Sequence, residues 1–271
     1  MKPSLFLFFL LSFAVAQAQL YIGVRGGVTL PQGFYAESRM SDNQWMFTQG
    51  HQKMAGAGRG WSGGVDVSFA LPVHPALEIT FQADFMQSGV SKNVKEYYDI
   101  RWATRFQNCS QYLMQLPKLR NIPIMAGVRY AYPASTTIDF YGEALAGVNL
   151  RYISDWNFAY SPADWPVDQP QSFDDYACAD LRTYAPATTF AFRLGAGFII
   201  AKRVTLGASF NMLGAAPLEW DRTDIARYNI YGTIVENSRT EHVTHTDINP
   251  TLLLVHLGFR LPATRRTVQD W

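Results

Sequence analysis

The sequence predicts an all-β fold: an eight-stranded antiparallel up-and-down transmembrane β-barrel. Three observations lead to this prediction. Eight segments alternate large apolar residues with small or polar ones, which is the period-two pattern of β-strands. The connections between them alternate between long and short. Finally, charged residues and glycines gather on one face of the strands, while the other face carries almost no charge.

Each predicted strand is about ten residues long, the length of a membrane-spanning strand. The strands cover residues 20–30, 61–71, 77–86, 112–130, 138–152, the hairpin 189–212 and 252–261. The stretch 112–130 is less regular because it contains Pro117 and Pro123, which indicate a bulge or an irregular strand. Eight is also the smallest strand number that is common among spanning barrels.

The connections predict which ends of the strands lie together. The long ones cover residues 31–60, 87–111, 153–188 and 213–250, and the short ones lie near 72–76, 131–136 and 201–203. In an antiparallel meander alternate connections lie at opposite ends, so the long loops share one end and the short turns share the other with both termini. Outer-membrane barrels show this asymmetry, with short periplasmic turns and long outer loops.

The polar face is predicted to line the barrel interior, where glycines make room for large neighbours. Opposite charges can pair across such a lumen, because an unpaired buried charge is costly. Glu143 on the neighbouring strand is the expected partner of Arg193. The predicted lumen charge network consists of Arg25, Asp66, Glu78, Asp84, Arg129, Glu143, Arg151, Arg193 and Arg260. The apolar face then meets lipid.

The N-terminus predicts export. Lys2, an apolar run over residues 5–15 and a small-x-small end make residues 1–18 a signal peptide, with cleavage between Ala18 and Gln19. The expected division is therefore a signal peptide (1–18), a bacterial outer-membrane barrel with four long extracellular loops (19–262) and a short periplasmic tail (263–271).

The long loops hold two further features. Cys109 and Cys178 are candidates for a disulfide, since an exported chain meets an oxidising compartment. Aromatic residues either form a contact surface or pack on one another as a lid over the barrel, and both interpretations stay open. These residues are Trp45, Trp102, Trp156, Trp165, Trp220, Tyr97, Tyr98, Tyr160 and Tyr176.

No catalytic, metal or cofactor site is predicted. The glycine pattern over residues 58–63 matches a dinucleotide fingerprint but lacks the following helix. His242 and His245 would point to opposite faces of an extended chain, which disfavours a shared metal. His256 faces inward, and Ser209 or Glu143 would be needed beside it for hydrolytic chemistry. The formal charge of +1 gives no reason to expect nucleic acid as a partner.

The barrel portion of 20–261 resembles eight-stranded outer-membrane proteins, most of all the porin-family or PorT-like barrels of Bacteroidota. The resemblance rests on "AQAQ" at the leader end, "LYIGVRGGVTL" (20–30), "LMQLPKLRNIPIMAGVRY" (113–130), "FYGEALAGVNLRY" (140–152) and "FAFRLGAGFIIAKRVTLGASF" (190–210). The long loops lie outside it. "HLGFRL" (256–261) resembles the closing strand of such barrels, but here the chain continues to Trp271.

The expected function is non-enzymatic: a membrane barrel whose long outer loops contact a ligand, surface or partner. The resemblance implies an alternative, a component of protein secretion or envelope assembly. A lipid-modifying enzyme is the third hypothesis. The expected partners are outer-membrane lipid and other envelope proteins.

Overall fold

The computed structural model describes residues 19–36, 57–92, 109–162, 172, 174, 176–230 and 233–263. The predicted signal peptide with Ala18 lies outside this range, as does the tail from residue 264, whereas Gln19 is the first residue of β1. Within the described residues no helix has the length and hydropathy needed to cross a membrane.

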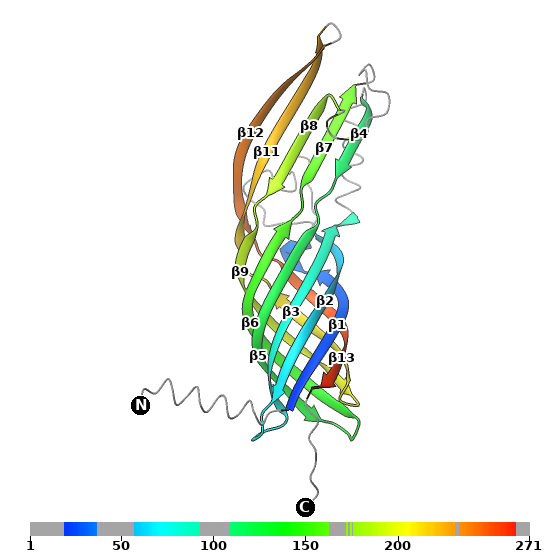
Figure 1. Ribbon diagram of the computed structural model, residues 1–271, viewed down its shortest axis with the longest axis vertical. Helices are drawn as coiled ribbons and strands as arrows, with labels where there is room; N and C mark the ends of the chain where they lie inside the picture. The colour runs from blue at the N-terminus through cyan, green and yellow to red at the C-terminus, as the bar shows by residue number, and fades with distance from the viewer. Residues whose placement is uncertain are drawn as a thin grey trace, which may run out of the picture.

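Eight strands close into an antiparallel barrel in the order β1-β13-β10-β9-β6-β5-β3-β2 (Figure 1). Each strand pairs with the barrel strand that follows it along the chain, and β13 pairs with β1 to complete the ring. The predicted fold class is thereby confirmed. The strands are β1 (Gln19–Pro31), β2 (Ala57–Ala70), β3 (Leu77–Val90), β5 (Leu119–Pro133), β6 (Ile138–Ile153), β9 (Ala187–Ile200), β10 (Val204–Met212) and β13 (Thr251–Pro262).

Five further strands form an open antiparallel sheet above the barrel, in the order β12-β11-β8-β7-β4 (Figure 1). They are β4 (Cys109–Gln115), β7 (Trp156–Pro162), β8 (Cys178–Tyr184), β11 (Ala216–Ile230) and β12 (Thr233–Ile248). This corrects the prediction in two places. Much of two long connections, 153–188 and 213–250, is regular strand, and the predicted strand 112–130 is two elements, β4 in the open sheet and β5 in the barrel.

The open sheet continues one arc of the barrel wall. Its order β12-β11-β8-β7-β4 follows the barrel order β13-β10-β9-β6-β5, because each sheet strand is joined to its barrel strand by a break of two or three residues. Proline cannot donate a ladder hydrogen bond, and it stands in three breaks (Pro117, Pro186, Pro250) and at the second position of β11 (Pro217). We call this row of breaks the seam.

The opposite end of the barrel holds the short turns and the ends of the described chain. Tyr21 pairs with Pro262 there. In the three-residue β9–β10 connection, Arg203 N–H donates to the carbonyl of Ile200, and the central residues Ala201 and Lys202 have positive φ (49° and 56°), as in a type I′ turn. A 3-10 turn, η1 (Gly33–Tyr35), follows β1 at the other end. The predicted separation of short and long connections is thus observed.

Candidate functional site

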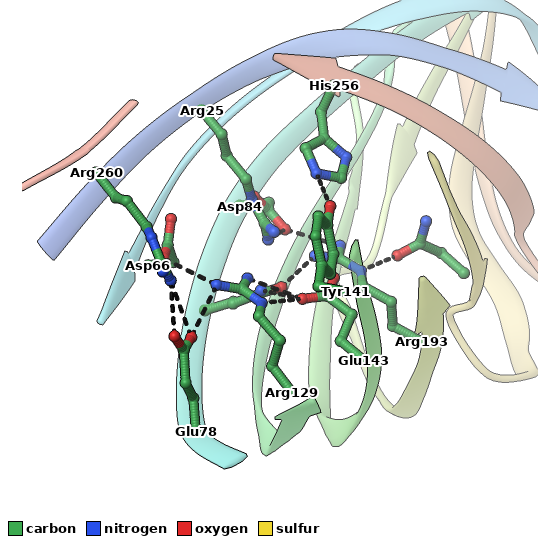
Figure 2. Close-up of polar contacts among 12 residues, drawn as sticks. Arg25, Asp66, Glu78, Asp84, Arg129, Tyr141, Glu143, Arg193, His256 and Arg260 are labelled. Carbon is green, nitrogen blue, oxygen red and sulfur yellow. Dashed lines mark hydrogen bonds and ion pairs between the residues drawn. The ribbon is translucent and has the colours of Figure 1, made fainter. Parts of the chain in front are cut away.

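The barrel interior has two layers, and the layer nearer the short turns is charged. All nine residues of the predicted lumen charge network are buried, with at most 7 % of each exposed. They come from β1, β2, β3, β5, β6, β9 and β13. Buried charges need opposite charges or hydrogen bonds close by, and eight of the nine side chains supply these to one another (Figure 2).

Asp84 is the centre of one group of ion pairs. Arg25 donates from Nε to Oδ1 of Asp84 (2.8 Å) and from Nη2 to Oδ2 (2.6 Å). Arg193, which is fully buried, reaches the same Oδ2 at 2.7 Å. It also donates to Oε1 of Gln82 (2.7 Å) and to Oδ1 of Asn211. One carboxylate on β3 therefore holds two guanidinium groups from distant strands.

Arg129 is the centre of the second group. It donates to Oε2 of Glu143 from Nη2 (2.8 Å) and Nε (3.1 Å), and its Nη1 lies 3.6 Å from Glu78 and 3.8 Å from Asp66. Arg260 donates to both oxygens of Glu78, at 2.9 and 3.0 Å. Gln82 bridges the two groups by donating to Oε2 of Glu143 (3.0 Å). The network is thus continuous from Arg260 to Arg25.

The predicted partnership of Arg193 with Glu143 is wrong. Arg193 pairs with Asp84 on β3 instead, and Glu143 pairs with Arg129 on β5. In the barrel order β6 and β5 lie between β9 and β3. Arg129 and Glu143 are direct partners on adjacent strands, but adjacency does not decide the partner of Arg193, because its long side chain reaches across a narrow lumen.

Glycines give these side chains their space. A Cβ on Gly64 would lie 2.0 Å from Oδ1 of Asp84, and one on Gly207 would lie 2.1 Å from the hydroxyl of Tyr141. A Cβ on Gly142, on the outer face, would meet nothing within 4 Å. The interior glycines are therefore required by close packing of the charged layer.

The layer nearer the open sheet is apolar. Met86, Met125, Leu145, Leu252 and Leu254 are each at most 2 % exposed, and they belong to a hydrophobic cluster that continues upward. From the open sheet this cluster includes Trp156, Tyr184, Leu218 and Trp220. Barrel interior and sheet thus share one core, which fixes the sheet to the barrel.

Polar side chains secure the seam within this apolar layer. Arg151 donates to the backbone carbonyls of Ile248 (3.0 Å), Ala216 (3.3 Å) and Pro217 (2.9 Å), where the ladder is interrupted.

Tyr35 in η1 is 2 % exposed and belongs to the same hydrophobic cluster. Burial raises the pKa of its hydroxyl to about 12, although Asn121 and Arg151 oppose the rise.

The open sheet carries a row of charges beyond its aromatic residues. Arg182 is 2 % exposed, lies 3.9 Å from the ring centre of Trp156 and donates to both oxygens of Asp180 (3.0 and 2.9 Å). Arg222 on β11 contacts Asp180 (3.2 Å), Asp224 (2.9 Å) and Glu241 (3.7 Å). These side chains share one sheet face, because their strands pair in register.

The hairpin of β11 and β12 extends furthest from the barrel (Figure 1). β8 pairs with β11 only between Trp220 and Ala226, whereas β12 follows β11 to its end. Near its tip Tyr228, Ile234 and Val235 are exposed by 56, 50 and 44 %. Within the described chain β12 pairs with β11 alone, so its other edge is an open strand edge.

The predicted disulfide is not formed, because the thiol of Cys178 is free. Cys109 begins β4 and Cys178 begins β8, and β7 lies between these strands. Two strand spacings are about 9.5 Å, which exceeds the Cα separation of roughly 7 Å that a disulfide allows.

Two of the histidines considered above, His256 and His242, have described side chains, and each contacts one polar side chain. Nε2 of His256 lies 3.0 Å from the Tyr141 hydroxyl, and Nδ1 has no hydrogen-bond partner among the described residues, so neither Ser209 nor Glu143 is hydrogen-bonded to this ring. Nδ1 of His242 lies 2.8 Å from Oδ1 of Asp221. The described residues include no group of three or more potential ligands for a metal ion. The glycine pattern 58–63 lies within β2, which no helix follows.

Several aromatic residues of the predicted loops pack inward. Trp156, Trp220 and Tyr176 are at most 4 % exposed, so these three form core rather than contact surface. Trp45, Trp102, Trp165, Tyr97 and Tyr98 lie outside the described residues. The exposed apolar residues of β11 and β12 were not singled out in the sequence, because residues 216–248 show no regular alternation of polar and apolar residues.

Several solved structures are similar to this chain. Neisserial surface protein A (NspA) is 11 % identical, with 90 % of this chain and 96 % of that chain covered at a TM-score of 0.40. The outer membrane protein OprG from Pseudomonas aeruginosa is 12 % identical, with coverages of 91 and 97 % and a TM-score of 0.42. Ail of Yersinia pestis is 11 % identical, with coverages of 90 and 97 % and a TM-score of 0.35. No family model and no curated protein matches the sequence.

Proposed function

We propose that this protein is a non-enzymatic bacterial outer-membrane barrel that presents its open sheet outside the cell to contact a ligand, surface or partner. The observation that carries the proposal is the inverted barrel. Its interior holds the charged network, whereas outward residues such as Val24, Phe81, Phe190 and Leu257 are 50–67 % exposed. Soluble proteins rarely expose a continuous apolar surface of this extent, and a closed barrel leaves no backbone edge in lipid.

Aromatic residues support the position of the bilayer. Tyr130 and Tyr132 are exposed near the short turns, and Trp61 and Tyr152 are exposed near the seam. Such residues favour both interfaces of a membrane. The short turns then face the periplasm with the N-terminus of β1, and the open sheet stands outside the cell.

The filled interior supports a contact function over transport. Charged residues pack the lower layer, and the cluster of Met86, Met125, Leu145, Leu252 and Leu254 packs the upper layer. An eight-stranded barrel has little room beyond its own side chains. The surface above the seam is therefore the part that meets other molecules.

Cysteine labelling of intact cells tests this topology. In a Cys109→Ser, Cys178→Ser background, Asn237→Cys places a thiol on exposed β12, and Lys202→Cys places one in the exposed β9–β10 turn. We expect a membrane-impermeant maleimide to label Asn237→Cys on whole cells and Lys202→Cys only after lysis. Labelling of both on whole cells, or recovery of the protein from the aqueous fraction without detergent, would contradict the proposal.

A further inference from the structure

Within the described residues, β12 pairs with β11 along one edge and with no strand along the other. It ends the open sheet, and residues 233–240 are exposed. Unpaired N–H and C=O groups on such an edge form a template for an added strand. Natural edges are commonly protected by charged side chains, so the charges on β12 decide whether pairing is blocked or directed.

The charges direct one register. If β12 pairs antiparallel with a second β12 about a twofold axis at Thr240, Arg239 lies opposite Glu241 of the second copy, and Glu241 lies opposite its Arg239. If one strand slides by two residues relative to the other, either Arg239 lies opposite Arg239 of the second copy or Glu241 lies opposite its Glu241. If the strand slides by one residue, its side chains move to the opposite face of the sheet. Opposite charges directly across a strand pair stabilise it, and like charges destabilise it.

The neighbouring strand extends this complementarity. Arg222 pairs across β11 and β12 with Glu241, and Asp224 pairs with Arg239. In the joined sheet, a row would run from Arg222 and Glu241 to Arg239 and Asp224 of the second copy. Charge alternates in sign along this row, and the twofold axis generates a second identical row.

The direction of β12 determines where the second copy lies. β12 leads through the seam into β13, so the strand runs toward the barrel, and its first residues, at the hairpin tip, lie furthest from the barrel (Figure 1). Antiparallel pairing therefore places the two barrels at opposite ends of the joined sheet, facing each other. They cannot share a membrane in this arrangement.

We propose that β12 joins this protein to a second copy of itself in a facing membrane, through an antiparallel β12–β12 ladder centred on Thr240. This inference rests on the proposed function, since it needs the barrel in a bilayer and the sheet outside. In the same ladder, the exposed tip residues Ile234 and Val235 come opposite residues 246 and 245 of the second copy.

Vesicle clustering tests the ladder. The full chain is reconstituted into phosphatidylcholine–phosphatidylglycerol vesicles, and insertion is verified by flotation before clustering is followed by light scattering. We expect wild-type vesicles to cluster, and the Arg239→Glu or Glu241→Arg variant to cluster about tenfold more slowly, since two attractive pairs become repulsive. Arg203→Glu, the same charge change in the exposed turn at the other end, leaves clustering unchanged.

Mixed populations separate recognition from misfolding. Vesicles with Arg239→Glu and vesicles with Glu241→Arg should cluster when mixed, because every cross-strand pair is then of opposite charge. The double variant Arg239→Glu, Glu241→Arg should cluster with itself and not with wild type. Clustering of wild type with protein-free vesicles would assign the contact to lipid and overturn the ladder.

The outcomes also separate the two proposals. A protein that fails to float with the vesicles contradicts the membrane barrel itself. An inserted protein whose vesicles stay dispersed, or whose variants cluster like wild type, overturns the ladder and leaves the barrel in place.

Discussion

The two layers of the barrel interior fill the same kind of space by opposite means. Both are built from inward positions of strands of the same closed barrel. The lower layer uses four arginines and four carboxylates that bind one another, whereas the upper layer uses methionine and leucine. The comparison teaches that ion pairs specify which distant strands meet, while the apolar layer joins the barrel to the sheet above it.

The largest effect should follow from Asp84→Ala. It leaves Arg25 and Arg193 without their shared carboxylate in a buried layer, and breaking a buried pair costs about 3–5 kcal/mol. We expect this loss in the free energy of unfolding, measured by urea titration in lipid vesicles. Asp155→Ala, at an exposed position in the seam, serves as the control. Equal stabilities of the two variants would mean that the charged layer does not stabilise the barrel.

Leu145→Ala tests the apolar layer. The side chain is 1 % exposed in the shared cluster, and such truncations cost about 2–5 kcal/mol. Because the cluster joins both parts, we expect the open sheet and the barrel to lose stability together. Hydrogen exchange of amides in β7 and β8 measures this coupling, and unchanged exchange there would separate the sheet from the barrel core. Leu206→Ala, at an exposed position on the outer face of the barrel, is the matched control.

Gly64→Ala tests the space beside Asp84. The added methyl would lie 2.0 Å from Oδ1 of Asp84 and 2.6 Å from the carbonyl of Ala83, and overpacking typically costs about 1–3 kcal/mol. Gly142→Ala adds the same methyl where nothing lies within 4 Å. Urea titration should show a loss for the first variant alone. A barrel that tolerates both would have more room than the packing indicates.

The smallest effect concerns Asp224 on the open sheet. Partial burial raises its pKa above the ordinary value and Asp180 adds to the rise, while Arg222 opposes it. The folded sheet then holds this proton more tightly than the unfolded chain, so the contribution of Asp224 to stability falls as pH rises from its unfolded pKa through its folded pKa. We expect Asp224→Asn to reduce this pH dependence in hydrogen exchange of β11. If the pH dependence of hydrogen exchange stayed the same in Asp224→Asn, Asp224 would not be the group that causes it.

The barrel could be predicted from sequence because its signals are local. Alternation, connection lengths and the glycine-rich polar face all depend on neighbouring positions, as in the hairpin around Arg193. The open sheet was missed because residues 216–248 carry charges on both faces, as in Asp221 and Arg222, which is typical of loops as well as exposed strands. The prolines of the seam were an available signal for the strand breaks.

The pairing inside the lumen could not be predicted in the same way. Which carboxylate meets Arg193 depends on the tilt and stagger of the strands around the closed barrel and on the reach of a long side chain. Glu143 lies on the strand next to that of Arg193 and is the partner expected from sequence. In the closed barrel, however, Asp84 is the carboxylate that contacts Arg193. The residues that form the lumen charge network were therefore predictable, but the partner of Arg193 was not.

The seam has a mechanical consequence. Each of the five sheet strands passes into the barrel wall after two or three residues, without a flexible linker. A pull on the β11–β12 hairpin is therefore carried as tension along the backbone into the closed ring of barrel strands. A strand ladder on the edge of β12 would be loaded in shear, with its hydrogen bonds sharing the force rather than opening one after another.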